Sequence, residues 1–186
     1  MALPQQNGNS NHKTSPQYQL GLIATARGAL LGTIILSTIN LLMLALDTGR
    51  YFLFSISVPY YLTWFGKILD NGTSDGSGSL VGTYTIMAIV IGLLILTVYL
   101  ITWLLSKKHR VWLTVATALF VVDTVALIVF AFTMLTNPMS CLLDFLLHAV
   151  ILFELIQGVL ANRKLQKAQL SDPHTPQGYR GTTPDL

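Results

Sequence analysis

The sequence predicts an all-α integral membrane protein, a bundle of four transmembrane helices whose N- and C-termini both lie in the cytoplasm. The first observation is composition: 52% of the 186 residues are hydrophobic and only 10% are charged, outside the usual range of soluble domains. The second is that the apolar residues form four runs of roughly 19 to 26 residues without Lys or Arg, long enough to cross a bilayer. The third is that Lys and Arg gather on one side of these runs.

The predicted spans are residues 28–46, 80–105, 111–136 and 139–161, which together form one transmembrane domain over residues 20–161. Polar turns separate the runs, among them Asn137-Pro138 between the third and the fourth. Residues 1–19 are rich in Gln, Asn, Ser and Pro, which predicts a disordered cytoplasmic tail. Residues 162–186 are expected to form a second tail that is basic at its start and disordered at its end.

Between the first two spans, residues 51–66 read YFLFSISVPYYLTWFG. The segment is rich in aromatic residues, is split by Pro59 and is too short to cross the bilayer as one apolar helix. Tyr and Trp favour headgroup depth, so an interfacial segment carrying Tyr51, Tyr60, Tyr61 and Trp64 is one interpretation. A short re-entrant segment that dips into the membrane is the other.

Orientation follows from the positions of Lys and Arg, because cytoplasmic segments retain positive charge during insertion. Nine fall on one side and two on the other; the nine are Lys13, Arg27, Lys107, Lys108, Arg110, Arg163, Lys164, Lys167 and Arg180, and the two are Arg50 and Lys67. We therefore expect a short cytoplasmic basic loop with Lys107, Lys108 and Arg110, and both termini on the same side as this loop.

Four ionisable residues fall inside the third and fourth spans: Asp123, Asp144, His148 and Glu154. Counting outward from the turn at Asn137-Pro138 places Asp123 between His148 and Glu154 in depth, and Asp144 and His148 are one helical turn apart. One interpretation is an interhelical clamp that fixes helix register. The other is a polar path for protons or ions, because buried carboxyl groups and imidazole can exchange protons.

Several activities are disfavoured, and we expect no enzyme, no cofactor, no catalytic residue and no metal site. The motif H-E-x-x-H is absent because Ala149 follows His148, and only one histidine lies inside a span, whereas bis-histidine haem needs two. A serine mechanism would need a buried serine near His148, and Ser140 lies two turns away at the helix mouth. The single cysteine, Cys141, excludes dithiol chemistry, and no basic stripe interleaved with aromatics indicates nucleic acid.

Three stretches of the sequence carry a resemblance to a known family: YFLFSISVPYYLTW at 51–64, SKKHRVWL at 106–113 and FVVDT at 120–124. Together they resemble a family of small four-span membrane proteins of Gram-positive gut bacteria, over roughly residues 28–167. That family carries no assigned activity. The resemblance therefore implies a bacterial plasma membrane location and transfers no catalytic residue.

The leading functional hypothesis is a non-enzymatic protein that acts in the bilayer through assembly with copies of itself or through contact with another membrane protein. The alternative is a small ion- or proton-coupled transport component that uses the intramembrane carboxylates and His148. In the first span, Gly28 and Gly32 match a small-x-x-x-small pattern, which predicts a close helix contact on that face.

Overall fold

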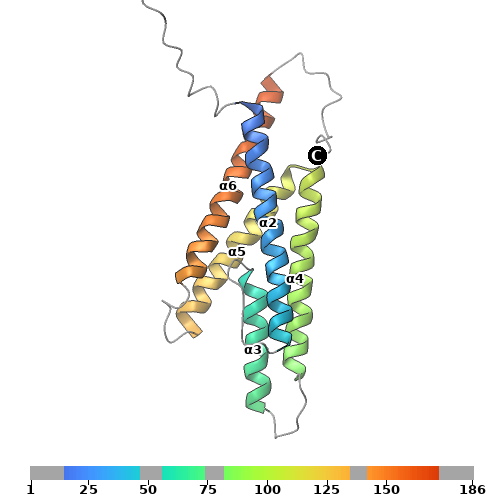
Figure 1. Ribbon diagram of the computed structural model, residues 1–186, viewed down its shortest axis with the longest axis vertical. Coiled ribbons are helices and arrows are strands. Elements are labelled where there is room, and N and C mark those ends of the chain that lie inside the picture. The colour runs from blue at the N-terminus through green and yellow to red at the C-terminus, as the bar shows by residue number, and fades with distance from the viewer. Residues whose placement is uncertain (1–14, 47–55, 74–81, 135–141, 172–186) are drawn as a thin grey trace, which may run out of the picture.

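The computed structural model describes residues 15–46, 56–73, 82–134 and 142–171. Five helices cover these residues, and none of them is in a strand: α2 (Pro16–Ala45), α3 (Ser57–Thr73), α4 (Thr83–Lys108), α5 (Val111–Met134) and α6 (Leu142–Ser171). All but α3 are long and apolar enough to cross a membrane (Figure 1). The predicted all-α class and the four membrane-spanning helices are thereby confirmed.

Two helices extend into the predicted tails. Helix α2 begins at Pro16, within the tail predicted for residues 1–19, because the Ser15 hydroxyl accepts a hydrogen bond from the Tyr18 amide (3.3 Å) and Pro16 suits the first helical position. Helix α6 continues to Ser171, beyond the predicted end of the span at residue 161, through Arg, Lys, Leu, Gln and Ala, which favour helix. Residues 1–14 and 172–186 lie outside the described residues.

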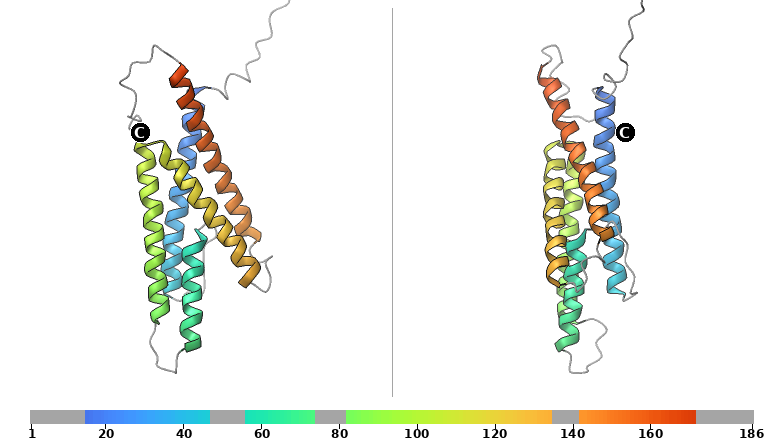
Figure 2. Two further views of the ribbon diagram at one scale, coloured as in Figure 1. Left: turned by 180° about the vertical axis from the view of Figure 1, so that it is seen from behind. Right: turned by 90° about the vertical axis from the view of Figure 1, so that its left-hand side faces the viewer.

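Four of the five helices pack as two close pairs within one bundle. Helix α2 packs along α6, and α3 packs along α4, while α5 crosses the bundle behind them (Figures 1 and 2). Helices α2 and α6 approach each other closely at Gly158, where an added Cβ would collide with the Cβ of Ala26. An added Cβ at Gly28 or Gly32 would meet no atom of the described residues within 4 Å. The close contact of α2 therefore uses Ala26 and not the predicted glycine face.

Helix α3 accounts for most of the segment that had two interpretations. It stands alongside α4 and antiparallel to it (Figure 2), so that a Cβ on Gly66 would lie 2.8 Å from the Tyr84 carbonyl oxygen. Pro59 is the third residue of α3, in the first turn, where a helix needs no backbone N–H. Helix α3 thus stands alongside α4 with its start inside the bundle and does not lie flat across the end of the bundle. Tyr51 lies outside the described residues.

The outward faces of the spanning helices are apolar. On α4 the exposed residues include Ile86, Val90, Leu94, Val98 and Ile101. In water such a surface would be an aggregation hazard, whereas a bilayer covers it with lipid chains of equal polarity. The structure therefore needs a membrane around it.

Charged side chains cap the ends of neighbouring helices. The Lys67 ammonium of α3 donates to the Leu44 carbonyl at the C-terminal end of α2 (3.2 Å), and the Asp70 carboxylate of α3 accepts from the Tyr84 and Thr85 amides at the start of α4 (3.1 and 2.8 Å). The Arg27 guanidinium of α2 donates to the Ser106 carbonyl in the last turn of α4. In each case the sign of the charge matches the helix dipole. These contacts supply partners that a helix cannot give to its own terminal groups.

Asp70 makes the stability of this arrangement depend on pH. Desolvation acts to raise the pKa of Asp70, but hydrogen bonds from the Thr85 hydroxyl (2.5 Å), the Thr85 amide and the Tyr84 amide outweigh it and hold the pKa below its usual value. A carboxyl group with a lowered folded pKa stabilises the fold fully above its unfolded pKa of about 3.9. That contribution is lost as the pH falls through the lower folded value.

We expect the wild-type protein in detergent micelles to be more stable than Asp70→Asn at pH 6, because the neutral amide caps α4 more weakly. The difference in melting temperature should shrink as the pH falls below about 4. Thermal unfolding followed by tryptophan fluorescence measures this difference. A gap that stays constant from pH 6 to pH 3 would show that the Asp70 charge does not cap α4.

Candidate functional site

The strongest concentration of buried polar groups lies at mid-depth in the bundle. Asp123 sits halfway along α5, His148 lies near the start of α6, and each has only 2% of its surface exposed. The His148 Nε2 atom lies 3.2 Å from the Asp123 Oδ2 atom. The structure thus brings together two of the four intramembrane residues that the sequence singled out.

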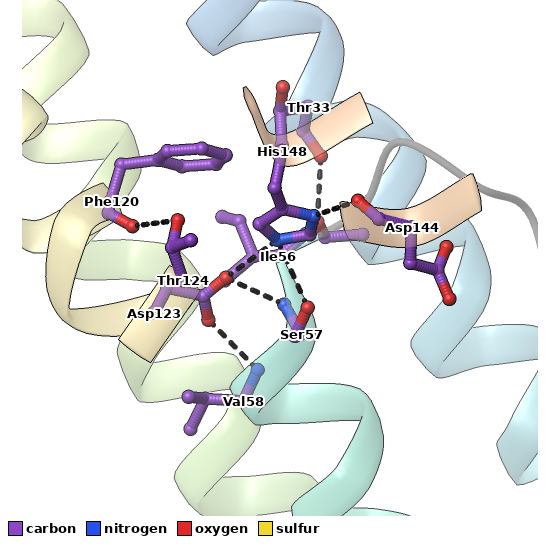
Figure 3. A network of polar contacts seen from close by, with 10 residues as sticks. Thr33, Ile56, Ser57, Val58, Phe120, Asp123, Thr124, Asp144 and His148 are labelled. Atoms are coloured by element: carbon purple, nitrogen blue, oxygen red, sulfur yellow. Dashed lines mark hydrogen bonds and ion pairs between the residues drawn. The ribbon is translucent and has the colours of Figure 1, made fainter. Parts of the chain in front are cut away.

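The third component is the start of α3, which Asp123 caps from another helix. The Ser57 amide donates to Asp123 Oδ2 and the Val58 amide to Asp123 Oδ1, both at 2.9 Å (Figure 3). The preceding amide, that of Ile56, donates to the Ser37 hydroxyl of α2 at 2.6 Å. Three successive amides at the start of α3 are therefore paired with side chains of α2 and α5. A carboxylate at this end of a helix is also favoured by the helix dipole.

The surroundings of His148 determine where its ring protons lie. Its Nδ1 atom is 2.9 Å from the backbone carbonyl oxygen of Asp144, which can only accept, so Nδ1 carries a proton and donates it. Its Nε2 atom contacts both Asp123 Oδ2 and the Ser57 hydroxyl, the latter at 3.1 Å. The Phe120 ring stacks on the imidazole with a centroid separation of 5.2 Å.

The contact between His148 Nε2 and Asp123 Oδ2 is a hydrogen bond only when a proton lies between the two atoms. With Nδ1 protonated, a bare Nε2 facing a bare carboxylate would set two lone pairs against each other. A proton between Nε2 and Oδ2 removes this conflict, either as imidazolium beside carboxylate or as neutral imidazole beside carboxylic acid. In both states the pair has no net charge, which lowers the cost of placing it inside a membrane.

Asp144 and Glu154 do not join this cluster. Asp144 contributes only its backbone carbonyl, and its half-buried carboxylate points away from the imidazole (Figure 3). Side chains on a helix lean toward its N-terminus, so the His148 ring covers the turn at Asp144 and leaves that carboxylate on the outside. Glu154 is half-buried, and no described residue gives its carboxylate a hydrogen bond or an ion pair.

Ser57 is the residue that the sequence analysis missed. A buried serine does lie beside His148, so the argument from Ser140 alone was wrong: Ser57 is 91 positions away in sequence and 3.1 Å away in space. A helix-start signal, Ser57 two positions before Pro59, was present but was hidden within an apolar run.

The geometry nonetheless differs from that of a nucleophilic serine. In a Ser-His-Asp triad the hydroxyl and the carboxylate contact opposite ring nitrogens, whereas Ser57 and Asp123 share Nε2. The amides at the start of α3 that could stabilise an oxyanion already hold Asp123. Among the described residues, no group of three His, Cys, Asp or Glu side chains is arranged to hold a metal ion.

An apolar groove begins next to this cluster and runs between α3 and α5. Its volume is about 270 Å³, and it is lined by Val58, Tyr61, Leu62, Phe65, Ala126, Leu127 and Phe130. The Tyr61 and Phe130 rings stack with centroids 4.0 Å apart, and Trp64 meets Phe130 edge-on at 5.7 Å. Val58 lines the groove and also donates to Asp123, so the cluster fixes the wall of the groove.

The remaining predicted site residues lie in two places, on α3 beside the groove and at the turn between α4 and α5. Tyr60 contacts Tyr61 edge-on, with ring centroids 5.3 Å apart, so the aromatic residues of α3 face one another and Phe130. At the turn between α4 and α5, the Lys107 ammonium lies 4.0 Å from the centre of the Trp103 ring, and Lys108 is exposed. The Arg110 carbonyl accepts from the Asn162 side chain of α6 at 2.9 Å.

Comparison of the chain with protein-family models, with curated proteins and with solved structures finds no match. The geometry of the cluster and of the groove therefore carries the functional argument.

We expect Asp123→Asn to lower the free energy of unfolding by about 1.5–3 kcal/mol, because hydrogen bonds to a charged acceptor at the start of α3 are weakened. Asp144→Asn is the matched control: the same chemical change in a carboxylate outside the cluster should shift stability by no more than about 0.5 kcal/mol. Denaturant unfolding in mixed micelles measures both. Equal losses for the two variants would contradict the assignment of Asp123 as the cap.

Proposed function

We propose that this protein is a non-enzymatic membrane protein that acts through contact with a partner in the bilayer, and that the groove between α3 and α5 is the contact surface. The observation that carries the proposal is that the polar groups at the centre of the bundle are hydrogen-bonded to one another and to the start of α3. Asp123, His148 and Ser57 bond to one another and to the start of α3. What they hold in place is an open, apolar groove next to them.

The chemistry of the groove favours a protein partner, namely an apolar transmembrane helix. Lipid chains adapt to flat aliphatic faces such as that of α4, whereas the groove is a hollow with walls fixed by stacked rings. Helices associate in membranes through close packing of side chains, and aromatic residues are enriched at protein contacts. A helix that places one apolar side chain into the hollow would bury Phe65 and Phe130 together.

The proposal places both termini in the cytoplasm and the protein in the plasma membrane. Support comes from the arrangement of the helix ends: the start of α2, the turn between α4 and α5, and the end of α6 lie at one end of the bundle (Figure 1). Arg27, Lys107, Lys108, Arg110 and Arg163 belong to these segments. A clustering of positive charge at one end is typical of the cytoplasmic side.

Site-specific photo-crosslinking tests the proposal. A benzophenone amino acid at Leu62, in the groove, should yield a discrete protein adduct in cells, whereas the same group at Val90, on the exposed face of α4, should yield lipid adducts. The adduct should disappear in Phe130→Ala. The captured protein must then form a complex with the purified wild-type chain but not with Phe130→Ala. Lipid adducts alone at both positions would contradict a protein-binding groove.

A second candidate function is proton-coupled transport, and one observation favours it. The Asp123–His148 pair lies at the start of α3, a helix that begins inside the bundle, and transporters commonly place their ion sites at such interrupted helices. Under this candidate, vesicles containing the wild-type chain dissipate a pH gradient faster than vesicles with the double variant Asp123→Asn, His148→Gln. Equal rates for the two would exclude it.

A further inference from the structure

A cluster of positive charge lies at the other end of the bundle from the groove. It consists of Arg27 on α2, Lys107 at the end of α4 and Arg110 in the turn before α5, and we call it the basic corner. Arg27 is fixed there from two sides: its guanidinium donates to the Ser106 carbonyl, and its own carbonyl accepts from the Trp103 indole at 3.1 Å. Two segments far apart in sequence, the first half of α2 and the turn between α4 and α5, thus meet in one place.

Two charges of the basic corner, those of Arg27 and Arg110, have no opposite charge paired with them among the described residues. Arg27 and Arg110 repel each other, and no described carboxylate forms an ion pair with either one. The Arg27 Nε atom is buried and has no hydrogen-bond partner among the described residues. The Arg110 guanidinium, half-buried, also lacks a hydrogen bond within the described part of the chain. Two like charges held together in this way form a site that favours an anion.

The position and geometry of the corner indicate which anion it is. It lies level with the turn that joins α4 to α5, where two spans end, and Trp103 with Lys107 stacked on its ring marks headgroup depth. Guanidinium groups present paired N–H donors that match the oxygens of a phosphate. Basic pockets between transmembrane helices on the cytoplasmic side bind anionic lipid headgroups in the same way.

We propose that the basic corner binds the phosphate group of an anionic phospholipid, with Arg27 and Arg110 as its ligands and Trp103 beside the glycerol backbone. The bound phosphate relieves the repulsion between the two arginines. It also secures the Arg27 contact that caps α4, so the lipid stabilises the junction of α2 with α4. This inference does not depend on the groove or on its partner.

Because the two arginines repel each other, Arg110→Gln should have opposite effects on stability without lipid and on lipid binding. In nonionic detergent without lipid, Arg110→Gln should raise the melting temperature, because it removes a like charge beside Arg27. In the same detergent, phosphatidylglycerol should stabilise the wild-type chain in a saturable manner. The variant should bind it roughly fivefold more weakly or worse, since one basic contact is lost. Arg163→Gln, which removes an equal charge from an exposed site on α6, should change neither quantity.

Phosphatidylcholine and inorganic phosphate complete the experiment. Saturable stabilisation by phosphatidylglycerol but not by phosphatidylcholine identifies a lipid as the source of the phosphate. Stabilisation by millimolar inorganic phosphate that is lost in Arg110→Gln identifies a soluble phosphate compound instead and retains the site. Equal stabilisation of the wild-type chain, Arg110→Gln and Arg163→Gln by phosphatidylglycerol would overturn the proposal, as would a lower melting temperature for Arg110→Gln without lipid.

Discussion

The amide and carbonyl groups at the two ends of a helix have no partner within that helix, and inside hydrocarbon no water is available to pair with them. This constraint explains where four of the charged residues of the bundle lie. Asp123 pairs with the start of α3, Asp70 with the start of α4, Lys67 with the end of α2 and Arg27 with the end of α4. Each charge belongs to a different helix from the end that it caps. The contacts that cap these helix ends therefore also hold neighbouring helices together.

The consequence is greatest for α3, the one described helix that is not a candidate membrane span. Its aromatic face packs against α5, and its start lies at the buried Asp123, so it cannot leave the bundle without exposing both a carboxylate and unpaired amides. His148 supports the arrangement through its contact with Asp123. The groove beside α3 exists because these polar contacts hold it there. The contacts that stabilise α3 therefore also maintain the groove that we propose as the partner-binding surface.

The sequence predicted the four spans well because a stretch without charges is a direct physical requirement for crossing hydrocarbon. The position of Asp123 could be compared in depth with that of His148, since only the predicted turn at Asn137-Pro138 separates their spans in the sequence. The role of Ser57 could not be derived, because Ser57 and Asp123 are 66 positions apart and the contact uses a backbone amide that every residue has. Asp144 lies on the same helix face as His148. Because side chains of a helix point toward its N-terminus, the His148 ring contacts the backbone carbonyl of Asp144 and not its carboxylate.

The central claim is that Asp123 holds the first amides of α3 inside the bundle. Hydrogen exchange measured amide by amide in lipid bicelles tests it most directly, because exchange reports on the pairing of individual N–H groups. The account predicts that the Ser57 and Val58 amides are as strongly protected as amides in the middle of α5, and that Asp123→Ala removes their protection while leaving that of α5 unchanged. Rapid exchange at Ser57 and Val58 in the wild-type protein would contradict it.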